Sequence, residues 1–155
     1  MDRCWANWHG DCSPYWIWQK IIVGDKNIKN AKEIARIMTN AGFDIEPVEG
    51  DIFSRTSILN MITIGQKYGE ISTLINSAGV SPSQASIEII LKVDLYGTAV
   101  LLEEVGKVIK SGGRGITISS QSGYRMPALT PEEDEQLACT PTEELLDLEI
   151  LNPKI

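Results

Sequence analysis

Apolar positions along the chain recur with two different periods, and the two patterns alternate. Short stretches rich in β-forming residues are each followed by a longer stretch with helical spacing. The predicted strands are residues 16–23, 43–48, 72–76 and 115–119, and the predicted helices are residues 30–40, 54–68 and 86–110. Because strands that alternate with helices form parallel sheets covered by helices, the pattern predicts an α/β domain.

The apolar faces of the first two predicted helices can be read directly from the spacing. They comprise Ile34, Ile37 and Met38 in the first helix, and Ile58, Ile62 and Gly65 in the second. Towards the end of the chain, Thr130 and Thr140 each precede a proline and an acidic turn. This arrangement predicts two short helices that begin at these two caps.

Small or polar residues follow each predicted strand at the point where it ends. They are Asp25, Asp51, the turn Asn76-Ser77-Ala78-Gly79, and Ser119-Ser120. In parallel sheets, ligands bind outside the carboxyl ends of the strands. We therefore expect a binding site at this edge of the sheet.

Each of these residues has a chemical and a purely structural interpretation. The carboxylate of Asp25 can accept both hydroxyl hydrogens of an adenosine ribose and would repel a 2′-phosphate, which favours NAD over NADP, but it can equally cap the next helix. Asp51 can meet an adenine amino group, although an N-cap is the simpler role. Ser120 can donate a hydrogen bond to a carbonyl oxygen, and the lack of an assignable His or Lys base disfavours a hydrolase nucleophile.

Composition and charge exclude several classes of function. The net charge of −7 and the pI near 4.7 disfavour binding to nucleic acids and to anionic membranes. No apolar run is long enough to span a bilayer, and the first twenty residues do not have the pattern of a signal peptide, so we expect a cytoplasmic protein. Three cysteines at wide spacing indicate no disulfide framework.

The first eighteen residues differ from the remainder. They contain all four tryptophans and the single histidine. Cys4, His9 and Cys12 could ligate a metal, but structural zinc sites need four ligands at tighter, paired spacing, so we predict no metal site.

Taken together, the strand-end motifs resemble those of the short-chain dehydrogenase/reductase family. The matching segments, in order, are Asp25, Gly50-Asp51-Ile52, Leu74-Ile75-Asn76-Ser77-Ala78-Gly79, Val93-Asp94-Leu95-Tyr96-Gly97 and Ile118-Ser119-Ser120. The resemblance implies a Rossmann-like sheet with helices on both faces and an NAD(P)-dependent oxidoreductase that acts on a small carbonyl or alcohol substrate.

The resemblance also implies a role for each matching residue. Asp25 would bind the ribose, Asp51 and Ile52 would lie at the adenine, and Asn76, Ala78 and Gly79 would lie along the cofactor. Ser120 would polarise the substrate oxygen. Asp94 stands where the family has an asparagine that supports a proton-relay water.

Two family motifs are not found in this sequence. The first strand with its glycine-rich turn should precede residue 19, and none of Tyr15, Tyr68, Tyr96 and Tyr124 is followed by a lysine four positions later. We therefore expect an incomplete Rossmann domain at residues 19–125, between a Trp-rich head (1–18) and a helical insertion or C-terminal stub (126–155). Without the Tyr-x3-Lys pair there is no general acid, so we expect the chain to be inactive alone.

Two other functions remain open at this stage. One is a non-catalytic interaction or regulatory fragment of the same fold, with a possible homo-oligomer contact through helix 86–110 and its residues Ile89, Val93, Val100 and Leu101. The other is a flavodoxin-like signalling domain with Asp25 and Asp51 as an acidic pocket, which is less favoured because the later lysines fall on the long helix.

Overall fold

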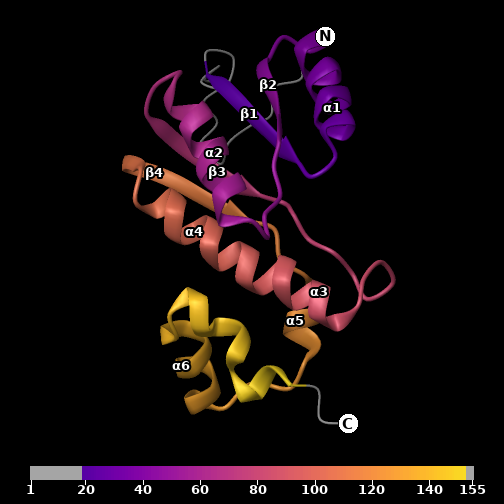
Figure 1. Ribbon diagram of the computed structural model, residues 1–155, viewed down its shortest axis with the longest axis vertical. Coiled ribbons are helices and arrows are strands. Elements are labelled where there is room, and N and C mark those ends of the chain that lie inside the picture. The colour runs from indigo at the N-terminus through magenta and orange to yellow at the C-terminus, as the bar shows by residue number, and fades with distance from the viewer. Residues whose placement is uncertain (1–18, 153–155) are drawn as a thin grey trace, which may run out of the picture. The chain divides into compact units, whose positions relative to one another are not determined.

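The computed structural model describes residues 19–152, which divide into two compact units between Gly50 and Asp51 (Figure 1). The first unit contains β1 (Lys20–Asp25), α1 (Ile28–Asn40) and β2 (Asp44–Glu49). The second contains α2 (Arg55–Gln66), β3 (Ile71–Asn76), α3 (Ile87–Ile90), the π-helical segment η1 (Leu91–Gly97), α4 (Thr98–Gly106), β4 (Ile109–Thr117), α5 (Gln121–Arg125), α6 (Pro131–Cys139), and the 3₁₀-helices η2 (Thr142–Asp147) and η3 (Glu149–Leu151). The Trp-rich head, its possible metal ligands and the first residues of the first predicted strand lie outside the described residues.

The first unit is a β-α-β element with parallel strands. Lys20 of β1 lies opposite Asp44 of β2, and the register continues to Asp25 opposite Glu49. Helix α1 begins at the N-cap Asn27 and buries two alanines, Ala31 and Ala35.

The apolar face that we predicted for α1 is wrong. Ile34 is 42% exposed and Ile37 is 55% exposed, whereas only Met38 of the predicted face is half-buried. The helix is instead buried along the stripe formed by the small side chains of Ala31 and Ala35, which permit close approach.

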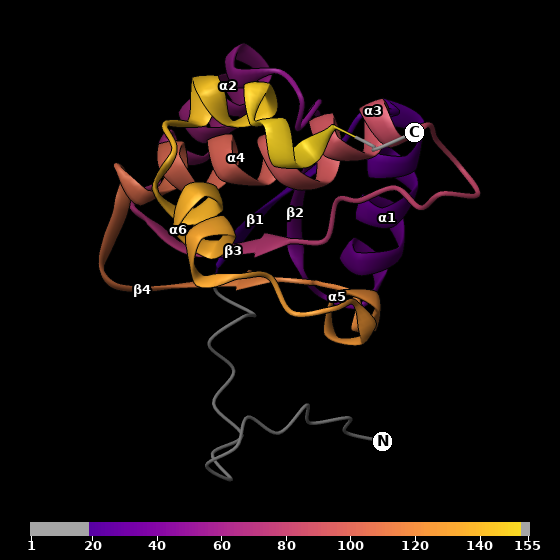
Figure 2. The same cartoon turned by 90° about the horizontal axis from the view of Figure 1, so that it is seen from below.

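The second unit has a parallel pair of strands, β3 and β4, with helices α2 and α4 packed on one face (Figure 2). Ile58 and Ile62 of α2 and Val100 and Val105 of α4 form the buried core, and Leu74 of β3 packs against it. The face predicted for residues 54–68 is confirmed, and Gly69 ends this helical region with a φ of 135°.

The opposite face of this strand pair is exposed. Ile75 lies opposite Ile116 in the register, so the two side chains share a face, and Ile118 follows on the same side. They are 57%, 50% and 62% exposed, respectively. Because parallel sheets are normally buried on both faces, this bare isoleucine face is unusual.

The long predicted helix 86–110 is confirmed as one unbroken helical run but is wrong in its end. It consists of α3, the π-helical η1 and α4, and it ends at Gly106. Strand β4 begins at Ile109, before the predicted position 115, because Ile109 pairs with Ile71 and packs against the core. Gly112 and Gly113, which follow the predicted helix in the sequence, lie within β4, where the register shifts, and Gly112 has a φ of 75°.

One of the two predicted acidic helices has the expected start. Thr130 caps α6 through a capping box with Glu133. Thr140, however, is the C-cap of α6, and a 3₁₀-helix follows Pro141, so this predicted cap is wrong. Leu145 of this 3₁₀-helix is buried, and no side chain caps the start of the helix.

The prediction of a parallel α/β fold is confirmed. Among the described residues, the strands form two separate pairs, β1–β2 and β3–β4, each parallel and each joined by a helical crossover. Within residues 19–152, every helix is too short or too polar to cross a lipid bilayer.

Candidate functional site

Asn76 lies at the carboxyl end of β3, and its side chain is buried. Its amide nitrogen donates to the hydroxyl of Thr98 on α4 at 3.2 Å, and its side-chain oxygen accepts from the backbone N–H of Ala78 at 3.2 Å. Its backbone carbonyl accepts from the N–H of Ile118 at 2.8 Å. Asn76 therefore joins the end of β3, the following turn, α4 and the end of β4.

Asp94 holds the loop that follows β3. Its Oδ1 accepts a hydrogen bond from the backbone N–H of Val80 at 2.9 Å, and a Cβ placed on Gly79 would lie 3.5 Å from the same oxygen. Asp94 is exposed and sits in the π-helical segment η1. Such wide turns occur frequently at functional sites, and here the turn presents a carboxylate to the exposed Ala78-Gly79 backbone.

Ser120 lies beyond the end of β4 and is the N-cap of α5. Its hydroxyl oxygen accepts from the backbone N–H of Ser122 at 3.1 Å. A serine hydroxyl can accept and donate at the same time, so this contact leaves the O–H available as a donor. The side chain of Ser120 is exposed.

Asp51 and Ile52 form the entry to α2. Oδ1 of Asp51 accepts from the N–H of Phe53 at 3.0 Å, while the Asp51 N–H donates to the Ser57 hydroxyl at 3.0 Å. The N-cap of α2 is Ser54, so the alternative that Asp51 caps this helix is wrong. Ile52 packs against the core cluster of the second unit, and its carbonyl lies close to the buried Gly97.

Asp25 is the last residue of β1 in the first unit. Its Oδ1 accepts from the N–H of Asn27 at 2.7 Å and from the side-chain nitrogen of Asn30 at 3.4 Å. Since Asn27 itself caps α1, Asp25 supports the cap from two residues before it. Both hydrogen bonds use one carboxylate oxygen, and the group is partly exposed.

The second unit thus gathers most of the predicted residues at one edge. Asn76, Ala78, Gly79 and Asp94 are connected through the loop after β3, and Ser120 follows the adjacent strand end. The structure describes Asp25 separately, within the first unit.

A charged cluster in the second unit was missed by the sequence reasoning. The guanidinium of Arg55 on α2 contacts Glu103 at 3.1 Å and Glu143 at 2.6 Å, and it also contacts Glu104. Lys107 contacts Glu103 at 2.8 Å and Glu104 at 3.0 Å. Only the contacts of Lys107 with Glu103 (i,i+4) and Glu104 (i,i+3) were readable as helical ion pairs, because the partners of Arg55 are distant in sequence.

This cluster shifts the pKa values of some of its members and attaches η2 to α2 and α4. The hydrogen bond from Arg55 lowers the pKa of Glu103 to about 2. Burial raises the pKa of Tyr96, whose hydroxyl donates to Glu143 of η2 at 3.1 Å. The cluster contains no nucleophile, so its role in this geometry is to attach the C-terminal segment.

Comparison with known proteins agrees with these features. The family model described as enoyl-(acyl carrier protein) reductase matches residues 19–130. Short-chain dehydrogenase/reductase bsc3 of Alternaria brassicicola is 30% identical over 138 residues, which cover 88% of this chain and 50% of that protein. The chain thus spans about half the length of this relative.

Solved structures show the same fold. A short-chain dehydrogenase/reductase of the glucose/ribitol dehydrogenase type from Brucella melitensis superimposes with a TM-score of 0.62 at 16% identity, covering 77% of this chain and 54% of that one. A 7α-hydroxysteroid dehydrogenase, solved with NADH and 7-oxo glycochenodeoxycholic acid, gives a TM-score of 0.61 at 16% identity, covering 77% of this chain and 50% of that one. With a family match over residues 19–130 and a Rossmann-type arrangement of strands, the chain belongs to the short-chain dehydrogenase/reductase family.

Proposed function

We propose that this chain carries cofactor-binding and substrate-polarising parts of an NAD-dependent oxidoreductase that acts on a carbonyl or alcohol, and that it does not catalyse hydride transfer alone. The observation that carries this proposal is the connected edge of the second unit. There, the exposed Ala78-Gly79 backbone is held by Asn76 and Asp94, and Ser120 stands at the next strand end. Family members use NAD(P), and the neighbour solved with NADH is an example.

The groups at this edge fit a cofactor and a substrate in different ways. Ala78 and Gly79 carry little or no side chain, so a flat ring can approach the backbone. Ser120 can donate its hydroxyl hydrogen to a substrate oxygen while its own oxygen remains bound to the Ser122 N–H. An ionised Asp94 has hydrogen-bond acceptors but no donor, unlike the asparagine of the family. It would therefore hold a water by accepting its hydrogens.

The absence of a Tyr-x3-Lys pair from the sequence supports the second part of the proposal. A bound NAD(P) supplies or accepts the hydride, but reduction of a carbonyl also needs a group that delivers a proton to the oxygen. The serine hydroxyl polarises the oxygen without a partner that replaces its proton. We therefore expect dinucleotide binding without turnover.

In the first unit, the preference for NAD is assigned to Asp25. With Oδ1 held by Asn27, Oδ2 can accept from a ribose hydroxyl, and the negative charge disfavours a 2′-phosphate. Asp25→Asn keeps an oxygen acceptor for the Asn27 N–H but removes the charge. Asp44→Asn is the matched control, because Asp44 is a carboxylate of the same unit that pairs with Lys20.

Calorimetric titration of the 155-residue chain with NAD and NADP tests the assignment. We expect NAD to bind more tightly than NADP, and we expect Asp25→Asn, but not Asp44→Asn, to reduce this preference by about ten-fold. Absence of dinucleotide binding would refute the cofactor assignment. Measurable oxidation of NADH with a carbonyl substrate would refute the proposed inactivity.

A second candidate, a non-catalytic interaction fragment, is favoured by the bare isoleucine face of Ile75, Ile116 and Ile118. Of the residues that we named for a homo-oligomer contact along helix 86–110, Val100 is fully buried in the core and cannot contact a partner, whereas Ile89 is exposed. Light scattering of the wild-type chain and of Ile116→Lys tests whether the isoleucine face forms a dimer contact. A strictly monomeric particle argues against this candidate, and a dimer that is lost in Ile116→Lys supports it.

A further inference from the structure

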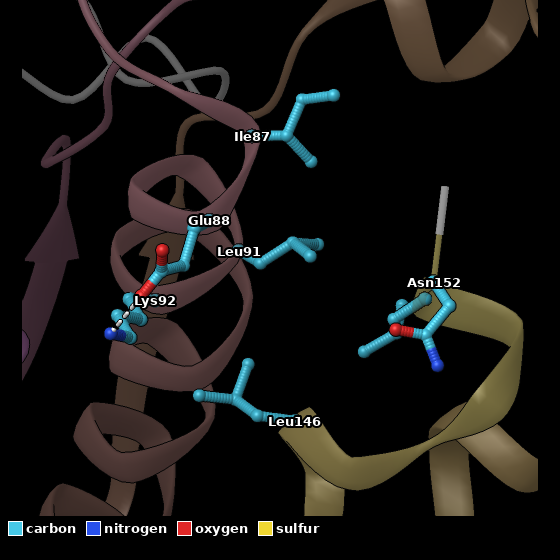
Figure 3. A pocket seen from close by; sticks show the side chains of 7 residues that line it. Ile87, Glu88, Leu91, Lys92, Leu146 and Asn152 are labelled. Atoms are coloured by element: carbon cyan, nitrogen blue, oxygen red, sulfur yellow. Dashed lines mark hydrogen bonds and ion pairs between the residues drawn. The ribbon is translucent and has the colours of Figure 1, made fainter. Parts of the chain in front are cut away.

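A groove lies between the first turns of the long helical region and the C-terminal 3₁₀ segment, within the second unit. Its volume is about 340 Å³, and its lining residues are Ile87, Glu88, Leu91, Lys92, Leu146, Leu151 and Asn152. Figure 3 shows Ile87 and Leu91 pointing into the open space from the helix, with Leu146 and Asn152 on the other wall. None of these residues belongs to the strand-end edge that carries Asn76, Asp94 and Ser120.

The groove combines an apolar lining with a few polar groups at its rim. Four of its seven residues are isoleucine or leucine, and the volume falls at the lower end of the range for small-molecule sites. Ile87 is 58% exposed, which is unfavourable for an isoleucine in water. An apolar ligand body in the groove would remove this surface from water.

The walls of the groove are held in place independently of any ligand. On one side, η2 is attached through Glu143, which contacts Arg55 at 2.6 Å and accepts from the Tyr96 hydroxyl at 3.1 Å. Tyr96 also packs edge-on against Phe53, with ring centroids 5.9 Å apart. Binding would therefore require little ordering of the walls, which favours affinity.

Lys92 and Glu88 form a charged pair at the rim, and the two side chains differ in their exposure to water. Lys92 donates to Glu88 at 2.6 Å, and its ammonium also lies 5.5 Å from the centre of the Phe53 ring. The side chain of Glu88 is 74% exposed, compared with 35% for Lys92. Glu88 can thus turn into water at small cost, because an exposed ion pair contributes little to stability, while the contact with the Phe53 ring retains the ammonium of Lys92.

We propose that this groove binds a medium-chain carboxylate, whose hydrocarbon tail lies along Ile87, Leu91 and Leu146 and whose head group replaces Glu88 as the partner of Lys92. The exchange conserves charge, since one carboxylate takes the position of another. It is independent of the proposed dehydrogenase function, because the residues of the two sites do not overlap.

Decanoate is the probe, used below the concentration at which it aggregates and titrated calorimetrically into the full chain. We expect Lys92→Gln to weaken binding by about ten-fold or more, since it removes a charge-assisted contact. Glu88→Gln should tighten binding several-fold, because it removes the competing carboxylate. Lys110→Gln makes the same change of charge outside the groove and should have no effect.

A second pair of variants separates the groove from other apolar surface. Leu146→Ser should weaken decanoate binding, whereas Ile116→Ser, on the bare isoleucine face, should not. If Leu146→Ser fails to fold by circular dichroism, amide chemical-shift changes in the wild-type chain provide the location, and they should fall on residues 87–92 and 146–152. Absence of decanoate binding, equal binding of decanol, weaker binding in Glu88→Gln, or equal losses in Lys92→Gln and Lys110→Gln would each overturn the proposal.

Discussion

Gly97 provides the sharpest test of how the second unit is packed. It ends the π-helical segment η1 and is buried. A Cβ placed on it would lie 2.9 Å from the carbonyl oxygen of Ile52, 3.2 Å from its carbonyl carbon and 3.1 Å from its side chain. Two of these three contacts are with backbone atoms, so a change of rotamer cannot relieve them.

Two opposing effects determine the consequence of Gly97→Ala. Replacing glycine by alanine in a helix contributes up to about 1 kcal/mol of stability. Overpacking a well-filled core destabilises by about 1–3 kcal/mol, and the backbone contacts at Gly97 favour the upper part of that range. We therefore expect a net loss of about 1–2 kcal/mol, which corresponds to a lower Tm by about 2–8 °C for a chain of this size.

Gly106→Ala is the matched control. Gly106 is the last residue of α4 in the same helical region, and a Cβ there would meet nothing within 4 Å. This variant should gain about 0.4–1 kcal/mol, because alanine restricts the unfolded chain. Thermal and urea unfolding of the two variants should therefore show shifts of opposite sign. The reasoning is refuted if Gly97→Ala unfolds at or above the wild-type midpoint while Gly106→Ala behaves as expected.

Three further substitutions test the contacts that hold other parts of the second unit. Thr130→Ala removes the capping box with Glu133 and should destabilise α6 by about 1 kcal/mol, measured as faster amide exchange in residues 131–139, while Thr130→Ser should retain protection. Arg55 lowers the pKa of Glu103 from 4.5 to about 2, so this carboxylate contributes stability above pH 4.5 that is lost as the pH falls towards 2; Glu103→Gln should flatten that part of a series of urea midpoints. Asn76→Ala removes the contacts with Thr98 and Ala78 and should cost about 1–3 kcal/mol in urea unfolding, and a variant as stable as the wild type would show that these contacts are replaced by water.

The sequence was sufficient to predict the alternation of elements, because strand and helix periods differ strongly. The predicted helix 54–68 was correct in its start, where Ser54 is the N-cap, and in its buried face, although it ends at Gln66. Ile58 and Ile62 lie one turn apart, and large aliphatic side chains decide burial there. The same rule failed in α1, where two alanines form the buried stripe. A hydrophobicity pattern gives weight to large side chains, whereas close packing of a helix can depend on small ones.

The start of β4 could not be predicted from local signals. Ser111-Gly112-Gly113 is an ordinary helix-ending sequence, yet β4 passes through it because Ile109 pairs with Ile71 and packs on the core. A Cβ on Gly113 would lie 2.5 Å from the Ile109 side chain, so that glycine serves the close contact within the strand. Such a contact depends on the register shift, which cannot be predicted from the spacing of apolar residues. The Arg55 cluster was missed because it is also a contact between residues distant in sequence, as Arg55 and Glu143 are.

Hydrogen-bonding capacity separates the predicted site residues into two groups, and this decides which substitutions can report on a ligand. Asn76 is buried, and both ends of its side-chain amide are bound to the protein, so its replacement reports first on the fold. Asp94 similarly uses an oxygen to hold the Val80 N–H. Ser120 differs, because its hydroxyl oxygen accepts from the Ser122 N–H and its hydroxyl hydrogen remains available as a donor. A substitution that keeps the acceptor and alters only the donor, or only the charge as in Asp25→Asn, changes what a ligand encounters while leaving the local turn intact. Effects of substitutions at Ser120 and Asp25 on dinucleotide or substrate binding are therefore interpretable. The same effects at Asn76 would follow from displacement of the loop that carries Ala78 and Gly79.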